Sequence, residues 1–202
     1  DYKALEEEAN KMIELDKVNP RIFRYLGYAA FENGNVDKAI QSLETFTSNP
    51  ASKIIAKDFQ VLGLAKIKKG TSADGLAIDP IAFESGLASI KKSIEMEPLA
   101  VEDLNEVGKK MFGQKLYKEA AAIFELGASN AESKSYLDDN LYLGLSLYYA
   151  NNKKDVKPEI AGLQKADAAF DKVLVASPSY YEAYIFKART NSMMENDENT
   201  IK

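Results

Sequence analysis

The 202-residue sequence contains no cysteine and no histidine, and its only arginines are Arg21, Arg24 and Arg189. Without cysteine the chain has no disulfide, no thiolate metal ligand and no cysteine nucleophile. Without histidine it lacks the commonest general base and the commonest transition-metal ligand. A phosphate-cradling glycine loop and a Gly-x-Ser-x-Gly motif are also absent. We therefore expect a protein that is not an enzyme and that uses no cofactor or metal.

Long apolar runs and an excess of basic charge are missing as well. No apolar stretch approaches the roughly 20 residues that a bilayer-spanning helix needs. The net charge is −5 and the pI is about 5.0, whereas binding to nucleic acid requires a clustered basic face. We expect neither membrane insertion nor nucleic-acid binding. The apolar content of 46% is nevertheless enough to bury a substantial core.

What the sequence does contain is an internal repeat. Small residues recur inside helical patterns at intervals of 36, 45, 36 and 44, at Gly27, Gly63, Gly108, Gly144 and Ala188. The alternation defines a larger unit of about 81 residues. At that distance SNPASK (48–53) returns as SNAESK (129–134), and Asp58 returns as Asp139. This register indicates tandem duplication of a unit that holds two helical hairpins.

Each hairpin shows apolar residues at helical spacing. In the first hairpin, Phe23, Leu26 and Ala30 share one helix face, and Gly34 ends that helix between two asparagines. The following stretch, VDKAIQSLETF, reads as the second helix. A small residue such as Gly27 lets the two helices approach closely. A bulky residue there would overpack the seam, at a cost of roughly 1–3 kcal/mol.

The repeated pattern is a large residue, two variable residues, a second large residue and a small one. It occurs at Phe23–Gly27, Phe59–Gly63 and Leu104–Gly108, with turn glycines at 34 and 70 and closing prolines at 98 and 178. It resembles the tetratricopeptide repeat (TPR) family of bacterial array proteins. The resemblance implies an all-α, right-handed superhelical solenoid of antiparallel hairpins with about nine to ten helices; an unrelated helical bundle is the alternative.

The resemblance covers a single TPR domain over 1–202. Its parts are the second helix of a preceding repeat at 1–16, hairpins at 20–50, 52–98, 101–131 and 135–178, and a C-terminal helix at 179–202. The start at a lone second helix favours a fragment of a longer array. The second and fourth hairpins exceed the usual length by insertions at 71–85 and 152–165. Asp79-Pro80 and Lys157-Pro158-Glu159 are helix-start signals, so we expect a loop followed by a second helix lengthened by about two turns. The insertions either pack on their own hairpins or form a second binding edge.

Two polar features need an interpretation of their own. Ser52 and Ser133 recur at the same register, and we expect each to be the N-cap of the next helix. Asp138 and Asp139 could suggest a metal site, but adjacent residues do not share a helix face. We therefore expect this pair to cap a helix or to lie on a solvated surface.

In proteins that resemble this one, the first helices of the repeats build a concave wall that holds a peptide or a partner's helix. Exposed aromatic residues beside arginine commonly anchor interfaces. The resemblance thus implies a non-catalytic protein-interaction scaffold whose partner is a protein or peptide, although Phe31 and Tyr148 are equally consistent with packing between hairpins. The candidate groove residues are Arg21, Arg24, Tyr28, Phe31, Lys57, Gln60, Leu64, Asn105, Lys109, Phe112, Leu141, Tyr148, Tyr149 and Arg189.

A glycan-binding protein is the alternative function, because seven of the eleven tyrosines lie between Tyr136 and Tyr184 and aromatic walls also suit sugars. Burial of both Tyr148 and Tyr149 would exclude it. Exposed end hairpins could also stack and produce self-association. The lysine-rich, cysteine-free, acidic composition is similar to TPR proteins of Gram-negative bacteria, several of which are exported. It leaves cytoplasm and periplasm open, with a slight preference for the cell envelope.

Overall fold

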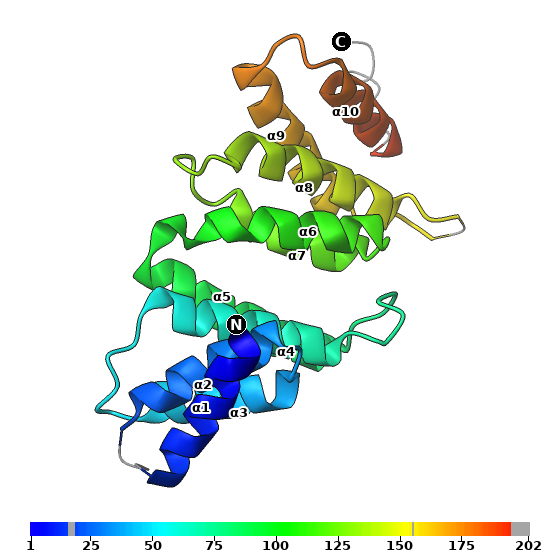
Figure 1. Cartoon of the computed structure of the whole chain (residues 1–202). Coiled ribbons are helices and arrows are strands. Elements are labelled where there is room, and N and C mark those ends of the chain that lie inside the picture. The colour runs from blue at the N-terminus through cyan, green and yellow to red at the C-terminus, as the bar shows by residue number, and fades with distance from the viewer. Residues whose placement is uncertain (16–18, 155, 195–202) are drawn as a thin grey trace. The chain divides into compact units, whose positions relative to one another are not determined.

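The computed structural model describes residues 1–15, 19–154 and 156–194. Within these ranges the chain forms ten α-helices, one 3₁₀ helix and no strand beyond an isolated bridge between Thr71 and Ile78. The chain divides into two compact units, 1–100 and 101–202, and each is described by itself (Figure 1). The single domain expected over 1–202 stays a prediction.

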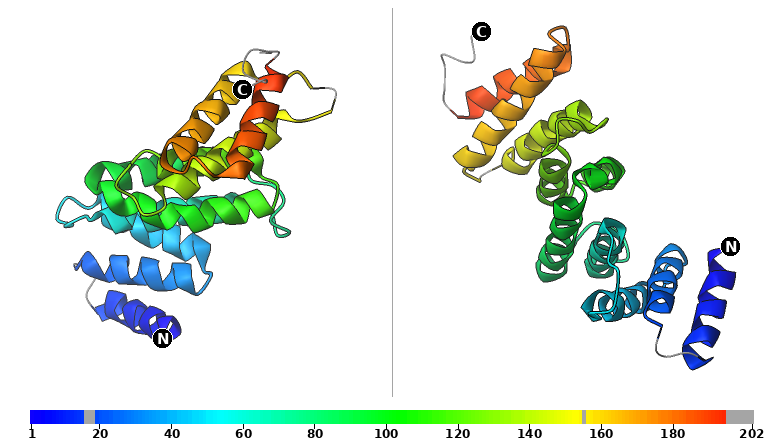
Figure 2. Two further views of the ribbon diagram at one scale, coloured as in Figure 1. Left: turned by 90° about the horizontal axis from the view of Figure 1, so that it is seen from above. Right: turned by 90° about the vertical axis from the view of Figure 1, so that its left-hand side faces the viewer.

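Every helix packs against the next one in its unit. The first unit contains α1 (Tyr2–Leu15), α2 (Arg21–Glu32), α3 (Val36–Ser48), α4 (Ala56–Gly70) and α5 (Pro80–Met96), and a 3₁₀ helix, η1 (Pro98–Asp103), follows. The second contains α6 (Leu104–Gly113), α7 (Tyr117–Gly127), α8 (Tyr136–Asn151), α9 (Ile160–Ala176) and α10 (Tyr181–Met193). Helix α2 also contacts α4, and α8 contacts both α6 and α10 (Figure 2). The first helices of neighbouring hairpins therefore form one wall within each unit. The end of the predicted first helix, Asp16, and residues 195–202 of the predicted last helix lie outside the described residues.

The helix-interior glycines lie where the two helices of a hairpin come closest. A Cβ placed on Gly27 would lie 2.5 Å from Leu43 Cγ of α3, and one on Gly108 would lie 2.6 Å from the Phe124 ring of α7. In the long hairpins, a Cβ on Gly63 would lie 2.7 Å from Ile90 Cγ1 of α5, and one on Gly144 would lie 2.6 Å from the Phe170 ring of α9. The four glycines thus occupy equivalent places, as the sequence pattern predicts.

The two insertions lengthen the hairpins by a loop and by a longer second helix. Helices α5 and α9 have 17 residues each, against 13 in α3 and 11 in α7. Asp79 caps α5 by accepting hydrogen bonds from the backbone N–H groups of Ile81 and Ala82, and Pro80 is the first helical residue. Helix α9 begins at Ile160, so Pro158 precedes its first turn and the predicted start is two residues early.

The expectation that Ser52 and Ser133 are helix N-caps is wrong. Helix α4 begins after Ile55 and α8 begins after Ser135, because the connecting segments continue for a few residues beyond each serine. The carboxylate of Asp58 accepts the Ile55 N–H at 2.8 Å and thereby satisfies a free donor at the start of α4. Ser133 instead accepts the Ser135 N–H at 3.2 Å in the turn that precedes α8.

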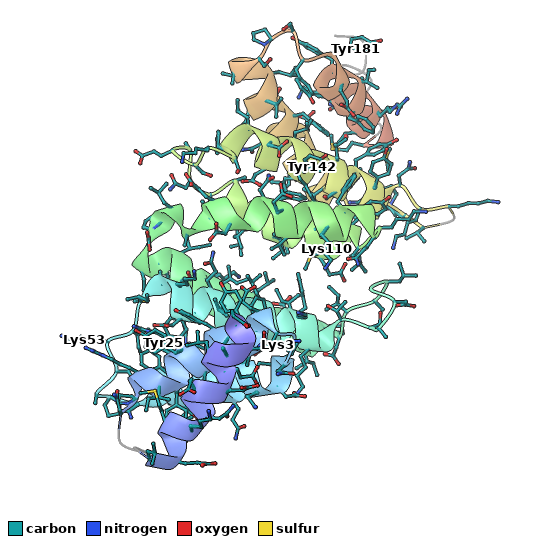
Figure 3. All side chains as sticks on the ribbon, in the orientation of Figure 1. Lys3, Tyr25, Lys53, Lys110, Tyr142 and Tyr181 are labelled. Atoms are coloured by element: carbon teal, nitrogen blue, oxygen red, sulfur yellow. The ribbon has the colours of Figure 1, made fainter. Side chains whose placement is uncertain are left out.

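Apolar side chains fill the spaces between the paired helices (Figure 3). In the first unit a buried cluster of Leu43, Val61 and Leu62 joins α3 to α4. In the second unit the core cluster combines aliphatic side chains with aromatic rings, and Phe170 and Phe186 are fully or nearly buried. These cores hold each wall of first helices against the second helices behind it. Among the described residues, no helix has the length and apolarity needed to cross a bilayer.

Candidate functional site

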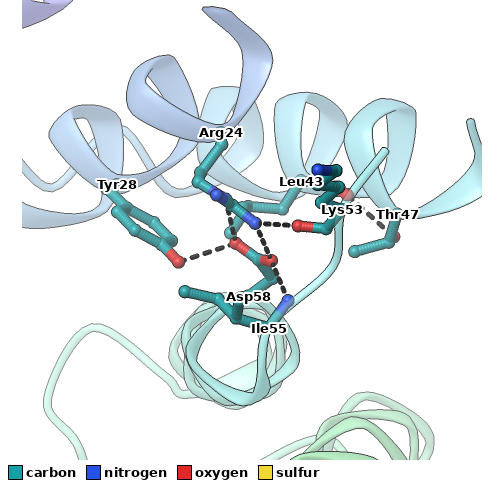
Figure 4. Close-up of polar contacts among 7 residues, drawn as sticks. All are labelled: Arg24, Tyr28, Leu43, Thr47, Lys53, Ile55 and Asp58. Atoms are coloured by element: carbon teal, nitrogen blue, oxygen red, sulfur yellow. Dashed lines mark hydrogen bonds and ion pairs between the residues drawn. The ribbon is translucent and has the colours of Figure 1, made fainter. Parts of the chain in front are cut away.

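A buried carboxylate, Asp58, organises the wall of the first unit. It lies in the first turn of α4, has no exposed surface and accepts hydrogen bonds from α2 (Figure 4). Arg24 donates through Nε and Nη2, both at 2.8 Å, and Tyr28 Oη donates at 2.6 Å. Arg24 and Tyr28 are four residues apart, so both side chains lie on the same face of α2. Arg24 also donates to the Lys53 carbonyl. The cluster therefore joins α2, α4 and the segment between α3 and α4.

The contacts within this cluster fix the protonation states of Arg24 and Tyr28. The hydrogen bond to Asp58 raises the pKa of Arg24, so the guanidinium stays charged. Burial, followed by the hydrogen bond to Asp58, raises the pKa of Tyr28 well above its ordinary value, so the phenol stays neutral and donates its proton. The Arg24 guanidinium also lies 4.5 Å from the centroid of the Phe46 ring. Two predicted groove residues are thus occupied by contacts within the unit.

The second unit repeats this cluster with different side chains. At a distance of 81 residues, Asn105 stands where Arg24 does, Lys109 where Tyr28 does, and Asp139 where Asp58 does. Asn105 Nδ2 donates to Asp139 Oδ1 at 2.7 Å and to Asp138 Oδ2 at 2.9 Å. Lys109 Nζ pairs with Asp138 Oδ2 at 2.6 Å. Asp139 therefore receives a neutral amide where Asp58 receives a guanidinium.

After this exchange, no cation among the described residues pairs with the buried Asp139. It has no exposed surface, and no described residue forms a hydrogen bond with its Oδ2 atom. Burial raises the pKa of Asp139 to about 6, against the lowering effect of the Asn105 hydrogen bond. The hydrogen bond to Asp138 raises the pKa of Lys109. A Cβ on Gly127 would lie 2.6 Å from Asp139 Oδ2, so α7 packs directly on the carboxylate.

The expectation that Asp138 and Asp139 cap a helix or lie on a solvated surface is therefore wrong for Asp139. The sequence pattern identified Asp58 only as a marker of the repeat, although the recurrence of this carboxylate as Asp139, in the first turn of another first helix, was the available signal for a buried polar cluster. Whether a carboxylate in the first turn of such a helix is buried depends on which residues of the preceding hairpin pack against it. Among the described residues, no group of three or more acidic side chains could hold a metal ion.

The predicted groove residues fall into three classes of exposure. Exposed are Arg21, Lys57 and Arg189; half-buried are Arg24, Tyr28, Phe31, Leu64, Lys109, Phe112 and Tyr149; buried are Gln60, Asn105, Leu141 and Tyr148. The predicted groove residues numbered 64 or lower lie on α2 and α4 of the first unit, and those numbered 105 or higher lie on α6, α8 and α10 of the second unit. Exposed side chains of the first wall include Tyr25, which the prediction omitted and which is 51% exposed.

Two tyrosines of the predicted groove, Tyr148 and Tyr149, pack against other aromatic rings. Tyr148 is 8% exposed and makes edge contacts with Tyr149 and Phe186, both at 5.2 Å between centroids. Tyr149 is half-buried and stacks on Tyr117 at 5.2 Å. These rings therefore do not form an open platform for a sugar, and the glycan alternative has no support.

No family model matches the sequence, and no curated protein matches it. Solved structures do. The C-terminal part of a TPR repeat-containing protein from Cytophaga hutchinsonii is 21% identical with a TM-score of 0.57, over 97% of this chain and 67% of that one. MamA of strain AMB-1 is 17% identical with a TM-score of 0.47, over 92% of this chain and 87% of that one. A thermophilic TPR protein from Thermus thermophilus is 15% identical with a TM-score of 0.45, over 96% of this chain and 90% of that one.

The first of these likenesses is close enough to identify the fold, and its low identity limits it to the fold. It agrees with the ten helices, the paired hairpins and the equivalent glycines described above. The chain has an all-α, TPR-type helical-repeat fold.

Proposed function

We propose that the chain is a non-catalytic protein-interaction scaffold, and that the walls of first helices hold a peptide or a helix of a protein partner. One observation carries this proposal: in the first unit α2 and α4 touch, and their shared face keeps polar and aromatic side chains available. Arg21 and Lys57 are exposed, while Tyr28 and Phe31 are half-buried. Residues of this kind are enriched in binding interfaces.

The buried cluster supports the same proposal because it makes the wall rigid. Arg24 and Tyr28 fix α2 to α4 through Asp58, so the exposed side chains beside them are presented on a pre-organised surface. Lys57 Nζ lies 5.8 Å from the Tyr28 ring centroid, which orients this lysine along the wall. In the second unit, Lys109 and Phe112 of α6 and Arg189 of α10 are the corresponding candidates.

The experiment compares pull-downs from native lysate with quantitative mass spectrometry. The test variant is Arg21→Glu/Lys57→Glu, which reverses two exposed charges without breaking the Asp58 cluster. Lys91→Glu/Lys110→Glu is the matched control, because both of these lysines are exposed as well. We expect the test variant to lose at least one partner that the wild type and the control retain. Equal recovery of every protein by all three would refute the proposed wall. Substitution of Arg24 or Tyr28 is unsuitable, because it would also destabilise the unit.

Self-association through the end helices is a second interaction to test. The outer face of α1 exposes Tyr2, Met12 and Leu15, and α10 exposes Tyr181 and Tyr184. Light scattering coupled to gel filtration over a hundredfold range of concentration measures it. A mass that rises with concentration for the wild type, and not for Met12→Glu/Tyr184→Glu, would support it. A monomer mass throughout would refute it.

A further inference from the structure

Each long hairpin builds a recess where its insertion begins. In the first unit a recess of about 540 Å³ lies between α3, the end of α4 and the start of α5. In the second unit a recess of about 280 Å³ lies between α7, the end of α8 and the start of α9. Ile40, Gly70 and Ile81 line the first recess; Ala121, Asn151 and Gly162 occupy the same repeat positions in the second. The duplication has therefore produced the same recess twice, away from the walls described above.

The charges of the two recesses differ. In the first unit, Lys66 pairs with Glu44 at 2.9 Å and Lys69 pairs with Asp37, so carboxylates of α3 neutralise both lysines. In the second unit, Leu147 and Ala150 replace these two lysines, and Lys118 replaces Asp37. The substitutions convert a neutralised polar surface into an apolar floor with a lysine beside it.

The inserted loop adds further positive charge to the second recess. Lys153 and Lys157 line it together with Lys118, and Glu159 is the one carboxylate among the lining residues. Within the described part of the chain, no carboxylate pairs with any of these three lysines. Asp155 lies outside the described residues and does not enter this count. A basic rim around an apolar floor contrasts with the net charge of −5 of the whole chain.

The rim of this recess is held by specific hydrogen bonds. Asn151 Oδ1 accepts the Glu159 N–H at 2.7 Å, and Asn151 Nδ2 donates to the Leu147 carbonyl at 2.8 Å. The first bond ties the end of α8 to Glu159, the residue before α9, across the loop, and the second, which lies within α8, fixes the orientation of the Asn151 amide. Gly162 adds no side chain to the space, and a Cβ there would lie 3.0 Å from Asn151 Nδ2. The recess is therefore open and pre-organised.

We propose that this second recess binds a short acidic segment of a protein partner. One apolar side chain of the segment would lie on Ala121, Leu147 and Ala150, and flanking carboxylates would pair with the surrounding lysines. Complementary charge supports this occupant, because it gives partners to three ammonium groups with which no carboxylate of the described residues pairs, while the apolar floor is covered. A bilayer is a poorer match, since it presents a plane of headgroups to lysines that surround a hollow. The site lies beyond the proposed wall and does not depend on it.

The test uses fluorescence polarisation with the full chain and two labelled peptides. The probe has a central leucine flanked on each side by two glutamates, and the control peptide has glutamines in their place. We expect the glutamate peptide to bind, and Lys118→Glu/Lys157→Glu to weaken its binding by at least about tenfold. Both lysines are exposed, so the fold should be retained, which circular dichroism checks. Lys91→Glu/Lys110→Glu, the matched control, should change affinity by less than about twofold.

Amide chemical shifts locate the bound peptide independently. We expect the largest changes at Ala121, Ala150 and Gly162, and unchanged binding in Arg21→Glu/Lys57→Glu. The proposal is overturned by no binding at millimolar peptide, by equal binding of the glutamine peptide, or by equal binding to the lysine variant. It is also overturned if phosphatidylserine vesicles bind in a manner abolished by the lysine substitutions while the peptide does not bind. Failure of the wall variants in the pull-down would leave this result unaffected, so the two proposals fail separately.

Discussion

Asp58 and Asp139 occupy equivalent positions in the repeat, yet we expect the same substitution to act differently on them. In Asp58→Asn, the half-buried Arg24 guanidinium loses its charged partner, and an amide N–H₂ replaces one acceptor oxygen. Removing one partner of a buried ion pair costs roughly 3–5 kcal/mol. The Arg24 side chain is 16% exposed and keeps some hydration, so we expect a loss near the lower end, about 3 kcal/mol.

In Asp139→Asn no cation loses a partner. Burial raises the pKa of Asp139 from 3.8 to about 6, and two units correspond to about 3 kcal/mol against the ionised form. The asparagine removes this penalty at neutral pH. Its amide N–H₂ would occupy the place of Oδ2, which has no hydrogen-bond partner among the described residues, and a buried unpaired donor costs roughly 1–3 kcal/mol. At pH 7.5 we therefore expect the unfolding free energy to stay within about 1 kcal/mol of the wild type, or to rise.

The pH dependence gives the sharper test of the reasoning. Because the folded-state pKa of Asp139 is raised, the folded protein binds the proton more tightly than the unfolded chain does. The resulting stabilisation is complete below the unfolded pKa of 3.8, and it is lost as the pH rises through about 6. Asparagine does not titrate. The stability of Asp139→Asn relative to wild type should thus increase by about 1.5–3 kcal/mol between pH 4 and 7.

Urea unfolding followed by circular dichroism, at four values between about pH 4 and 7.5, measures these differences. Native-state hydrogen exchange then assigns each change to the first or the second unit. The other carboxylates titrate in both proteins, so their effects cancel in the comparison. Equal losses for Asp58→Asn and Asp139→Asn at pH 7.5 would refute the reasoning, as would a relative stability of Asp139→Asn that does not change with pH.

Three further predictions concern the packing and the ion pairs. Gly144→Ala should cost about 1–3 kcal/mol of stability, because the added Cβ meets the Phe170 ring. Gly113→Ala should be neutral or slightly stabilising, because a Cβ added there has no atom within 4 Å. Thermal melts of the two variants compare these effects. Arg24→Ala should destabilise the first unit by about 3 kcal/mol in urea unfolding, and a loss under about 1 kcal/mol would contradict an essential ion pair. Lys187→Met should lower the unfolding free energy by about 1 kcal/mol, because the ammonium lies 2.6 Å from Asp167 and 2.9 Å from Asp171. Because salt screens these ion pairs, the loss should be smaller in high salt. A loss that does not depend on salt would show that the ion pairs are not its cause.

Much of the helical architecture could be predicted because its determinants are local. The spacing of Phe23, Leu26 and Gly27 defines a helix face within a few residues, and the same spacing recurs in the later hairpins. A glycine inside a helix lowers helix stability, and close packing against a neighbouring helix offsets this cost. The recurring glycines are therefore expected where two helices pack closely. Asp79-Pro80 placed the start of α5 correctly for the same local reason.

The candidate site could be predicted less well. The prediction that Arg24 and Tyr28 face a partner did not include the carboxylate, 34 and 30 residues away, that accepts their hydrogen bonds. Tyr148 was expected on the wall, but aromatic rings from neighbouring helices cover it. The exposure of a side chain depends on which helix packs over it, and a single helix sequence does not contain that information.

The helices, their pairing into hairpins and the duplication of an 81-residue unit follow from the residue pattern, because periodicity and glycine placement act over short distances along the chain. The packing of distant helices, in contrast, is what neutralises Asp58 with an arginine and buries Asp139 beside an amide. The same arrangement forms two recesses at the paired insertions: carboxylates neutralise the lysines of the first, and no carboxylate among the described residues pairs with the lysines of the second. The physical reason is the range of the interaction: the charge that a buried group meets is set by residues that folding brings together from distant parts of the chain.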